Sequence, residues 1–291
     1  MKDFGLKNFE QYSRYHETLI RKNTSIYHYT DINAFESILK TGSFWATKCQ
    51  HFLKDKDETK HSLDILDKIS EQKGMKAILD NATKKTFLDK WERETKKTYL
   101  VSFSKSKKSK SLLEACGEKC VIIELDTTAI DKKFIGSGLD IFDKNNNPDN
   151  IHAYNFFNEV IYGNLEITKY IRKLYDKFYN EYQNDINIEN RHDRFPQLFQ
   201  LALLYKDVKY YPENEIRIVF TLIVNDTEKV ENFRIIDDKK IPYMNISFKT
   251  DGKLPIKSVK VKSDLISKVE HILKENGYDT PVLELAIKTI T

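Results

Sequence analysis

The chain has 291 residues, and its 48 lysines and arginines nearly balance its 44 aspartates and glutamates, for a formal net charge of +4. That balance does not indicate nucleic-acid binding by bulk charge. The sequence has no apolar run of the roughly 18 residues needed to span a membrane, and residues 1–7 lack the apolar core of a signal peptide. Cys49, Cys116 and Cys120 make no even framework, so we expect reduced thiols in a cytoplasmic protein.

The first predicted elements of the main fold are a strand followed by a helix. Residues 25–30 are rich in aromatic and β-branched side chains, which favour a strand. Residues 32–40 place apolar side chains on one helical face, with Thr30 or Asp31 as the N-cap. Gly42 stands where a helix commonly ends in the left-handed conformation. The pattern predicts a strand, a helix and a turn into a short apolar segment.

Three stretches show helical periodicity with charged outer faces. Residues 1–24 predict an N-terminal helix, and residues 58–98 and 165–209 each predict a pair of helices. All three alternate apolar residues with lysine, glutamate or asparagine. We expect them to be additions to, or insertions into, the main fold.

The remaining elements are short strands and one late helix, at 264–275, which Gly277 ends. Because the strands are interleaved irregularly with helices, the sequence predicts one α+β domain over residues 1–291, without a regular βαβ repeat. The predicted strands are 99–104, 120–126, 159–162, 215–223, 233–236, 244–248, 257–262 and 282–287.

Two glutamates lie where an aromatic turn becomes a strand. In the segment 210–220, Glu213 and Glu215 are separated by one residue, and Arg217 follows at the same spacing. Alternate residues of a strand share a face, so the three charges are expected to gather there. A carboxylate at such a junction is a candidate catalytic group, and a neighbouring like charge shifts its pKa. The alternative is a half-exposed edge strand whose charges face water.

A histidine and a pair of serines occur in two other predicted strands. His28 lies between Tyr27 and Tyr29, whose rings can stack on a ligand. Ser102 and Ser104 present both hydroxyls on one face of their strand. The alternative for His28 is a packed core histidine, and paired serines on a strand are common.

A possible metal site precedes the first predicted helical insertion. Asp55, Glu58 and His61 have a spacing that brings three ligand types together at a helix start. Loops of this composition are more often helix caps and solvated faces. The lysine- and serine-rich loop 105–111 offers amides and charges to phosphates. Together these residues support a metal-dependent nuclease as an alternative function.

Several of these segments resemble the bacterial family named domain of unknown function 2971. Two residues depart from its pattern, since Lys54 stands where asparagine is usual, and Tyr210 or Tyr211 where tryptophan is usual. Its W-x-x-Y segment after the serine strand is also missing. The resemblance extends from about residue 25 to the end of the chain and is carried by Tyr27-His28-Tyr29-Thr30, Phe35 to Gly42, Leu53 to Glu58, Val101 to Ser104, Lys206 to Arg217 and Lys253 to Ile287.

The order of histidine, serine pair and Glu-x-Glu is also similar, more distantly, to the ADP-ribosyltransferase superfamily. This resemblance implies a split, mostly antiparallel sheet with helical insertions. It implies that Glu215 steadies an oxocarbenium-like transition state, with Glu213 beside the acceptor. His28 would join the two glutamates as a catalytic residue by holding the cofactor, and Ser102 or Ser104 would support the nicotinamide pocket. Three further residues are expected to bind the cofactor: Tyr29, Thr30 and Arg217.

The resemblance implies an enzyme that uses NAD as substrate and needs no metal. It would transfer ADP-ribose to a protein or nucleic acid, or cleave the nicotinamide bond, as a bacterial toxin or phage-defence effector with a possible partner protein from a defence operon. The main alternative is a non-catalytic binding or sensor module that keeps the pocket without the chemistry.

Overall fold

The computed structural model describes residues 25–52, 89, 92–130, 140–142, 153–162, 203–222, 230–236 and 238–285. The predicted N-terminal helix and nearly all of both predicted helical insertions lie outside these ranges. The strands are β1 (Ser25–Asp31), β2 (Phe44–Lys48), β3 (Thr98–Ser104), β4 (Cys120–Asp126), β5 (Asp140–Phe142), β6 (Ala153–Glu159), β7 (Ile161–Tyr162), β8 (Tyr205–Lys206), β9 (Glu215–Leu222), β10 (Asn232–Ile236), β11 (Lys239–Ser247), β12 (Ile256–Val261) and β13 (Val282–Glu284). The helices are α2 (Ile32–Thr41), α3 (Cys49–Phe52), α6 (Lys110–Cys116) and α11 (Ile266–Glu275), with 3-10 turns η3 (Val208–Glu213) and η4 (Ser263–Leu265).

The described strands form an 11-stranded sheet and a separate pair, β7 and β8. In the large sheet, the described pairings are antiparallel except that of β12 with β13. The prediction of a mixed chain with a mostly antiparallel sheet is therefore confirmed. None of the helices described is long and apolar enough to cross a membrane.

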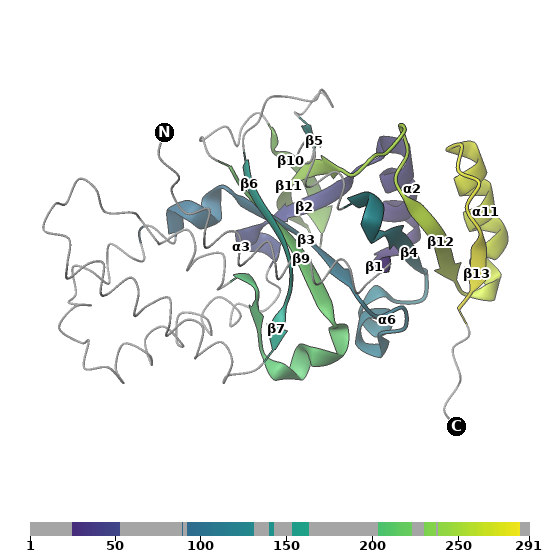
Figure 1. The fold of residues 1–291 in the computed structure, drawn as a ribbon, viewed down its shortest axis with the longest axis horizontal. Helices are drawn as coiled ribbons and strands as arrows, with labels where there is room; N and C mark the ends of the chain where they lie inside the picture. The colour runs from purple at the N-terminus through teal and green to yellow at the C-terminus, as the bar shows by residue number, and fades with distance from the viewer. Residues whose placement is uncertain are drawn as a thin grey trace, which may run out of the picture.

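The strand β9 lies inside the sheet, between β3 and β6 (Figure 1). All eight of its residues are buried, including Glu215 and Arg217. The hypothesis of a half-exposed edge strand is therefore wrong, because a neighbour pairs with each edge of β9. Four alternate side chains fill the core on one face: Ile216, Ile218, Phe220 and Leu222.

The helix α2 begins and ends where its sequence predicts. The Asp31 carboxylate accepts hydrogen bonds from the amides of Asn33 at 2.8 Å and Ala34 at 3.0 Å, so Asp31 is the N-cap. Gly42 ends the helix with φ of 61°, a conformation that costs glycine little. A Cβ at that position would overlap the end of the flexible Lys249 side chain, which would have to move aside, so it is the positive φ that favours glycine.

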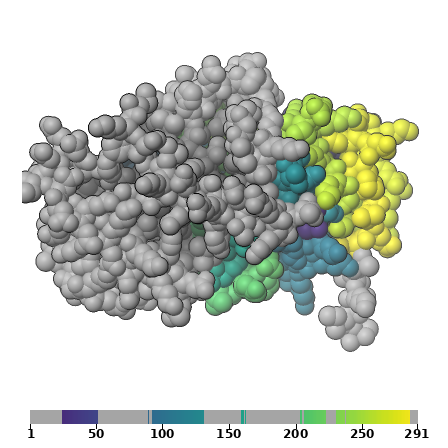
Figure 2. Space-filling view, viewed as in Figure 1, coloured from purple at the N-terminus to yellow at the C-terminus, as the bar shows by residue number. Residues whose placement is uncertain are grey.

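One face of the sheet carries the main hydrophobic core, and α2 and α11 pack against that face. The helix α11 lies at one end of the molecule beside β13, and its residues form part of the surface there (Figures 1 and 2). The helices contribute seven buried side chains: Ile32, Phe35, Ile38, Leu39, Val269, Ile272 and Leu273. The opposite face of the sheet carries the polar groups described below.

Two strands share one edge of β3 and diverge from each other. Near the start of β3, Leu100 pairs with Thr47 of β2. At its end, Ser104 pairs with Tyr27 of β1. No described strand pairs with residues 101–103 on that edge. The sheet therefore splits along β3, with β2, β11 and β10 on one side and β1, β4, β12 and β13 on the other.

Candidate functional site

The side chain of Glu215 is positioned by a sharp change of backbone direction. The turn η3 ends at Glu213, and Asn214 adopts a left-handed conformation with φ of 45°. Asparagine tolerates this conformation better than most residues. The amide of Glu215 then donates a 2.8 Å hydrogen bond to the Tyr162 hydroxyl. The sequence expectation that Glu213 lies on the turn and Glu215 begins the strand matches this geometry.

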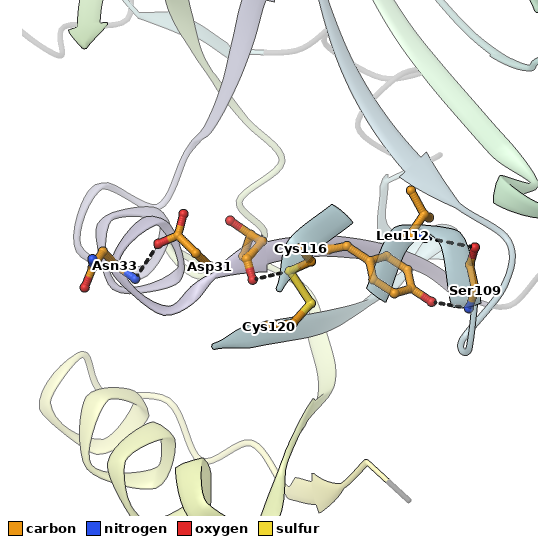
Figure 3. Close-up of a disulfide and its surroundings, with 8 residues drawn as sticks. Asp31, Asn33, Ser109, Leu112, Cys116 and Cys120 are labelled. Carbon is orange, nitrogen blue, oxygen red and sulfur yellow. Dashed lines mark hydrogen bonds between the residues drawn. A yellow bond between two sulfur atoms is a disulfide. The ribbon is translucent and has the colours of Figure 1, made fainter. Parts of the chain in front are cut away.

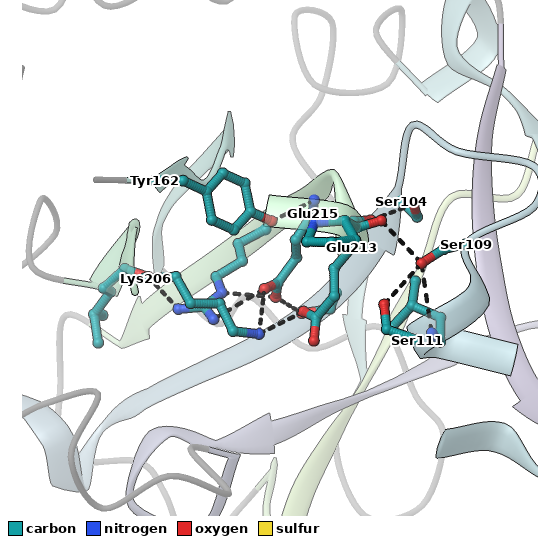
Figure 4. A network of polar contacts seen from close by, with 12 residues as sticks. Ser104, Ser109, Ser111, Tyr162, Lys206, Glu213 and Glu215 are labelled. Atoms are coloured by element: carbon teal, nitrogen blue, oxygen red, sulfur yellow. Dashed lines mark hydrogen bonds and ion pairs between the residues drawn. The ribbon is translucent and has the colours of Figure 1, made fainter. Parts of the chain in front are cut away.

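The Glu215 carboxylate accepts hydrogen bonds from three side chains (Figure 4). The Ser102 hydroxyl donates to Oε1. Arg217 Nε donates to Oε1 at 2.7 Å, and Lys206 Nζ lies 3.1 Å from Oε2. Arg217 is fixed in turn by the Leu203 carbonyl, which accepts from Nη1 at 2.6 Å. The buried Glu215 carboxylate thus has two cationic partners, and the charges balance only when Glu213, the second partner of Lys206, is included.

The Glu215 carboxyl is ionised across the physiological pH range. Burial favours its neutral form, which by itself would raise the pKa. The charge and hydrogen bonds of Arg217, the charge of Lys206 and the hydrogen bond from Ser102 outweigh burial and lower the pKa to about 2. Glu215 is therefore a fixed negative charge near pH 7 and not a proton donor.

Lys206 bridges the two glutamates. Its ammonium group lies 2.6 Å from Glu213 Oε2 and 3.1 Å from Glu215 Oε2, and it packs over the Tyr210 ring. The Glu213 side chain is 17% exposed, against 6% for Glu215. The cluster therefore has a buried member and a more accessible one, joined by a cation on a long side chain.

Ser104 holds the turn that carries Glu213. Its fully buried hydroxyl donates to the Glu213 carbonyl at 2.6 Å and accepts from the Ser106 amide at 3.0 Å. The Lys105 amide donates to the Asn214 carbonyl at 2.9 Å. The two predicted serines therefore share a face but contact different groups. Ser102 contacts a carboxylate, and Ser104 contacts backbone.

The structure does not place the His28 ring on the face that carries Ser102 and Glu215. Tyr27 is paired with Ser104, so the neighbouring residue His28 points to the opposite face. Its ring lies 5.1 Å from that of Phe44 and 5.4 Å from that of Phe103, measured between centroids.

His28 nevertheless contacts β3 where the sheet splits. Its Nδ1 lies 3.1 Å from the Ser102 carbonyl, which requires the proton on Nδ1. Burial lowers the pKa of His28 to about 4, so the ring is neutral near pH 7. It therefore supplies the hydrogen bond that no neighbouring strand supplies to this carbonyl.

Tyr29 organises the lysine- and serine-rich loop. Its hydroxyl donates to the Ser106 carbonyl at 2.8 Å and accepts from the Ser109 amide at 2.9 Å. Ser109, with the hydrogen bonds that it makes, is seen in Figure 3. The Ser109 hydroxyl caps α6 and donates to the Pro212 carbonyl at 3.0 Å. The loop 105–111 is thus fastened to both β1 and the turn η3, and the Tyr29 hydroxyl is already engaged by backbone groups.

The expectation of reduced thiols is wrong for two of the three cysteines. Cys116 and Cys120 form a disulfide with Cα atoms 5.3 Å apart (Figure 3). Gly117, with φ of 83°, lets the chain turn back between α6 and β4, which brings the two sulfurs together. The Cys116 sulfur also lies 3.2 Å from the carbonyl of Thr30, a predicted cofactor-binding residue whose side chain is half-buried.

The proposed metal ligands Asp55, Glu58 and His61 lie outside the described residues. Within the part of the chain that is described, no three histidine, cysteine, aspartate or glutamate side chains gather as a metal site would require. Sequence reasoning also missed Lys206 and Tyr162 as members of the glutamate cluster. Lys206 begins the Lys206–Arg217 segment that carries the first resemblance, yet its contact with both glutamates was not anticipated. Tyr162 has no motif neighbour and reaches Glu215 only because segments distant in the sequence meet.

Comparison with known proteins gives little further guidance. No family model matches the chain, and no curated protein matches it. A solved structure of DarT from Thermus sp. 2.9, in complex with ADP-ribosylated ssDNA, is similar over 91% of this chain and 95% of that chain. The identity is 13% and the TM-score is 0.35, values too low to carry an argument about this chain. The two family resemblances of the sequence therefore stay predictions.

Proposed function

We propose that this chain is an ADP-ribosyltransferase-like enzyme that binds NAD and breaks the bond between nicotinamide and ribose. The observation that carries the proposal is the Glu215 carboxylate, which is buried, ionised and hydrogen-bonded to the Ser102 hydroxyl beside the turn η3. A fixed negative charge at such a place is suited to a reaction that builds positive charge on its substrate.

The chemistry balances with the chain's own groups and an acceptor. The bond between the nicotinamide nitrogen and ribose C1′ breaks, and its electron pair neutralises the pyridinium nitrogen. Positive charge develops on the ribose, where Glu215 stabilises it electrostatically or through a ribose hydroxyl. Water or an acceptor nucleophile then bonds to C1′ and loses a proton. Glu213, the more exposed carboxylate, is the proposed proton acceptor.

Lys206 must move for a ribose to reach Glu215. Its ammonium is closer to Glu213 than to Glu215, and its side chain has four rotatable bonds. We assign it the role of a displaceable partner that keeps its contact with Glu213 when substrate enters. Arg217 is 1% exposed and hydrogen-bonded to the Leu203 carbonyl, so it stays in place and positions the carboxylate.

The other predicted site residues take positioning roles in this proposal. Ser104 fixes the turn that carries Glu213, and His28 fixes the β3 backbone at Ser102. Tyr29 secures the loop 105–111. We propose water, protein or nucleic acid as the acceptor, and a toxin or phage-defence role for the enzyme with any of the three.

A non-catalytic NAD-binding module is the second candidate. One observation favours it, because Glu215 already contacts two cations that offset its charge. If Lys206 did not leave, the carboxylate would bind a ribose hydroxyl weakly and stabilise little developing charge. Turnover, and not binding, separates the two candidates.

The test is nicotinamide release from NAD, measured with and without protein and single-stranded DNA as acceptors. We expect Glu215→Gln to lower release by at least about 100-fold. The matched control is Glu114→Gln, which removes an exposed carboxylate on α6 and should leave release unchanged. NAD binding without release by the wild-type chain would favour the non-catalytic module.

A second variant tests whether misfolding could explain the loss of release. This is needed because Glu215→Gln leaves Arg217 buried without a full negative partner. Glu215→Asp keeps the charge but withdraws the carboxylate by one methylene. Release should fall sharply in Glu215→Asp, while its far-UV circular dichroism matches the wild type. Wild-type turnover in both folded variants would refute the assignment of Glu215.

A further inference from the structure

Arg234 presents a guanidinium that forms no direct ion pair among the described residues. Burial lowers its pKa, and the charge of the Asp31 carboxylate opposes this shift from a distance. It belongs to β10, and its side chain crosses the sheet face toward β2, where its Nη2 donates to the Thr47 hydroxyl at 2.8 Å. Its Nε is buried and has no hydrogen-bond partner. A buried donor without an acceptor is uncommon in folded proteins and calls for an explanation.

Two aromatic rings frame this guanidinium. Its central carbon lies 5.4 Å from the Trp45 ring centroid and 5.9 Å from that of Tyr243. The two rings are 5.0 Å apart with an interplanar angle of 38°. Both residues are half-buried, so part of each ring reaches the surface. Cation–π contact accounts for the position of the guanidinium but leaves the Nε donor unused.

The strand registers place this cluster on the same sheet face as the Glu215 site. Tyr243 pairs with Thr47, and Thr47 pairs with Leu100, two residues before Ser102 on β3. Arg234 pairs with Ile241, so it shares the face of Tyr243. The strands β2 and β9 flank β3 on opposite edges, about 10 Å apart, and Thr47 and Glu215 pair with β3 residues four positions apart, so Thr47 and Glu215 are separated by about 16 Å on the diagonal. One extended dinucleotide can cover that span.

The geometry points to a nucleotide subsite formed by Arg234, Trp45 and Tyr243, in which the guanidinium binds a phosphate of a nucleoside diphosphate and an aromatic ring stacks on its base. An anionic phosphate oxygen supplies the hydrogen-bond acceptor that Nε lacks. A planar base can stack on an aromatic ring of the cluster. The identification of this ligand as the adenosine diphosphate part of NAD rests on the proposed function. The subsite itself does not.

The first test is calorimetric binding of ADP to the full chain, because ADP has no bond for the enzyme to cleave. Arg234→Gln should weaken ADP binding by about tenfold or more. Trp45→Leu should weaken it by about tenfold. The control is Arg93→Gln, which removes an arginine that is 61% exposed and lies beside Glu94. ADP affinity should not change in the control.

Two further probes separate the phosphate from the base. Adenosine binding as tightly as ADP would overturn the role of Arg234, and pyrophosphate binding as tightly as ADP would overturn the role of the rings. Equal ADP affinity in the wild type and Arg234→Gln, or no ADP binding at all, would overturn the subsite. Loss of ADP binding in Arg234→Gln without any wild-type NAD turnover would retain the subsite and reject the enzyme.

Discussion

Arg217 and Arg234 lie on the same face of one sheet and are partnered in opposite ways. Arg217 is 1% exposed, paired with Glu215 and hydrogen-bonded to the Leu203 carbonyl. Arg234 is half-buried, has one hydrogen bond to Thr47 and stacks on aromatic rings. A guanidinium that is ion-paired and hydrogen-bonded within the protein stabilises the fold. A guanidinium with no direct ion pair and an unused Nε donor is available to bind a ligand.

The largest expected effect is a difference in folding stability between variants of the two arginines. Arg217→Met leaves Glu215 buried with only Lys206 as a cationic partner, and removing one member of a buried ion pair costs about 3–5 kcal/mol. Arg234→Met removes no ion pair, so we expect stability within about 1 kcal/mol of wild type. Urea unfolding measures both values. Equal losses in the two variants would contradict the contrast.

The next largest effect is the dependence of folding stability on pH that the Glu215 carboxyl causes. Its pKa is about 2 in the folded chain, below the ordinary value of 4.5. The unfolded chain therefore binds more protons between these values, so the stabilisation is complete above pH 4.5 and is lost as the pH falls toward 2. The free energy of unfolding should fall by on the order of 3 kcal/mol over this range. Urea unfolding at several pH values should show this loss in the wild type and not in Glu215→Gln.

A smaller effect comes from the disulfide that fastens α6 to β4. The bonded cysteines are separated by 4 positions, and closing so short a loop stabilises the fold by about 2 kcal/mol. Replacing both Cys116 and Cys120 by serine should lower stability by that amount. Reductant should lower the wild type equally and leave the double variant unchanged. A reductant effect on the variant would place the sensitive group elsewhere.

The smallest effect concerns the helix that follows β1. Asp31→Ala removes the N-cap of α2 and should cost about 1 kcal/mol in thermal or urea unfolding. Asp31→Asn is the matched control, because asparagine caps a helix as well as aspartate does. A loss of the same size in the control would assign the effect to charge instead of capping.

Local patterns were sufficient to predict the elements around β1, α2 and β9. The Asp31 cap, the Gly42 stop and the alternation from Ile216 to Phe220 are each encoded within a few residues. The same alternation did not reveal that β9 is interior. Burial of Glu215 depends on which strands pair with β9, and that information is spread over distant segments.

The candidate site was predictable only in part, for the same reason. Ser102 and Glu215 were identified from their positions in strands, and the structure joins them directly. His28 was expected beside them, but the register of β1 against β3 turns its ring to the core face. Arg234 carries no local signal, because it acquires its role from partners on other strands. Lys206 lies in one segment with both glutamates, but the sequence spacing alone did not indicate that it bridges them.

The most direct measurement is a crystal structure of Glu215→Gln with NAD bound. The variant should bind NAD without consuming it. We expect the nicotinamide ribose against residue 215 and Ser102, and the diphosphate within hydrogen-bond distance of Arg234. NAD bound with its ribose on another face of the sheet, or with its phosphates away from Arg234 and its ribose away from residue 215, would contradict the account.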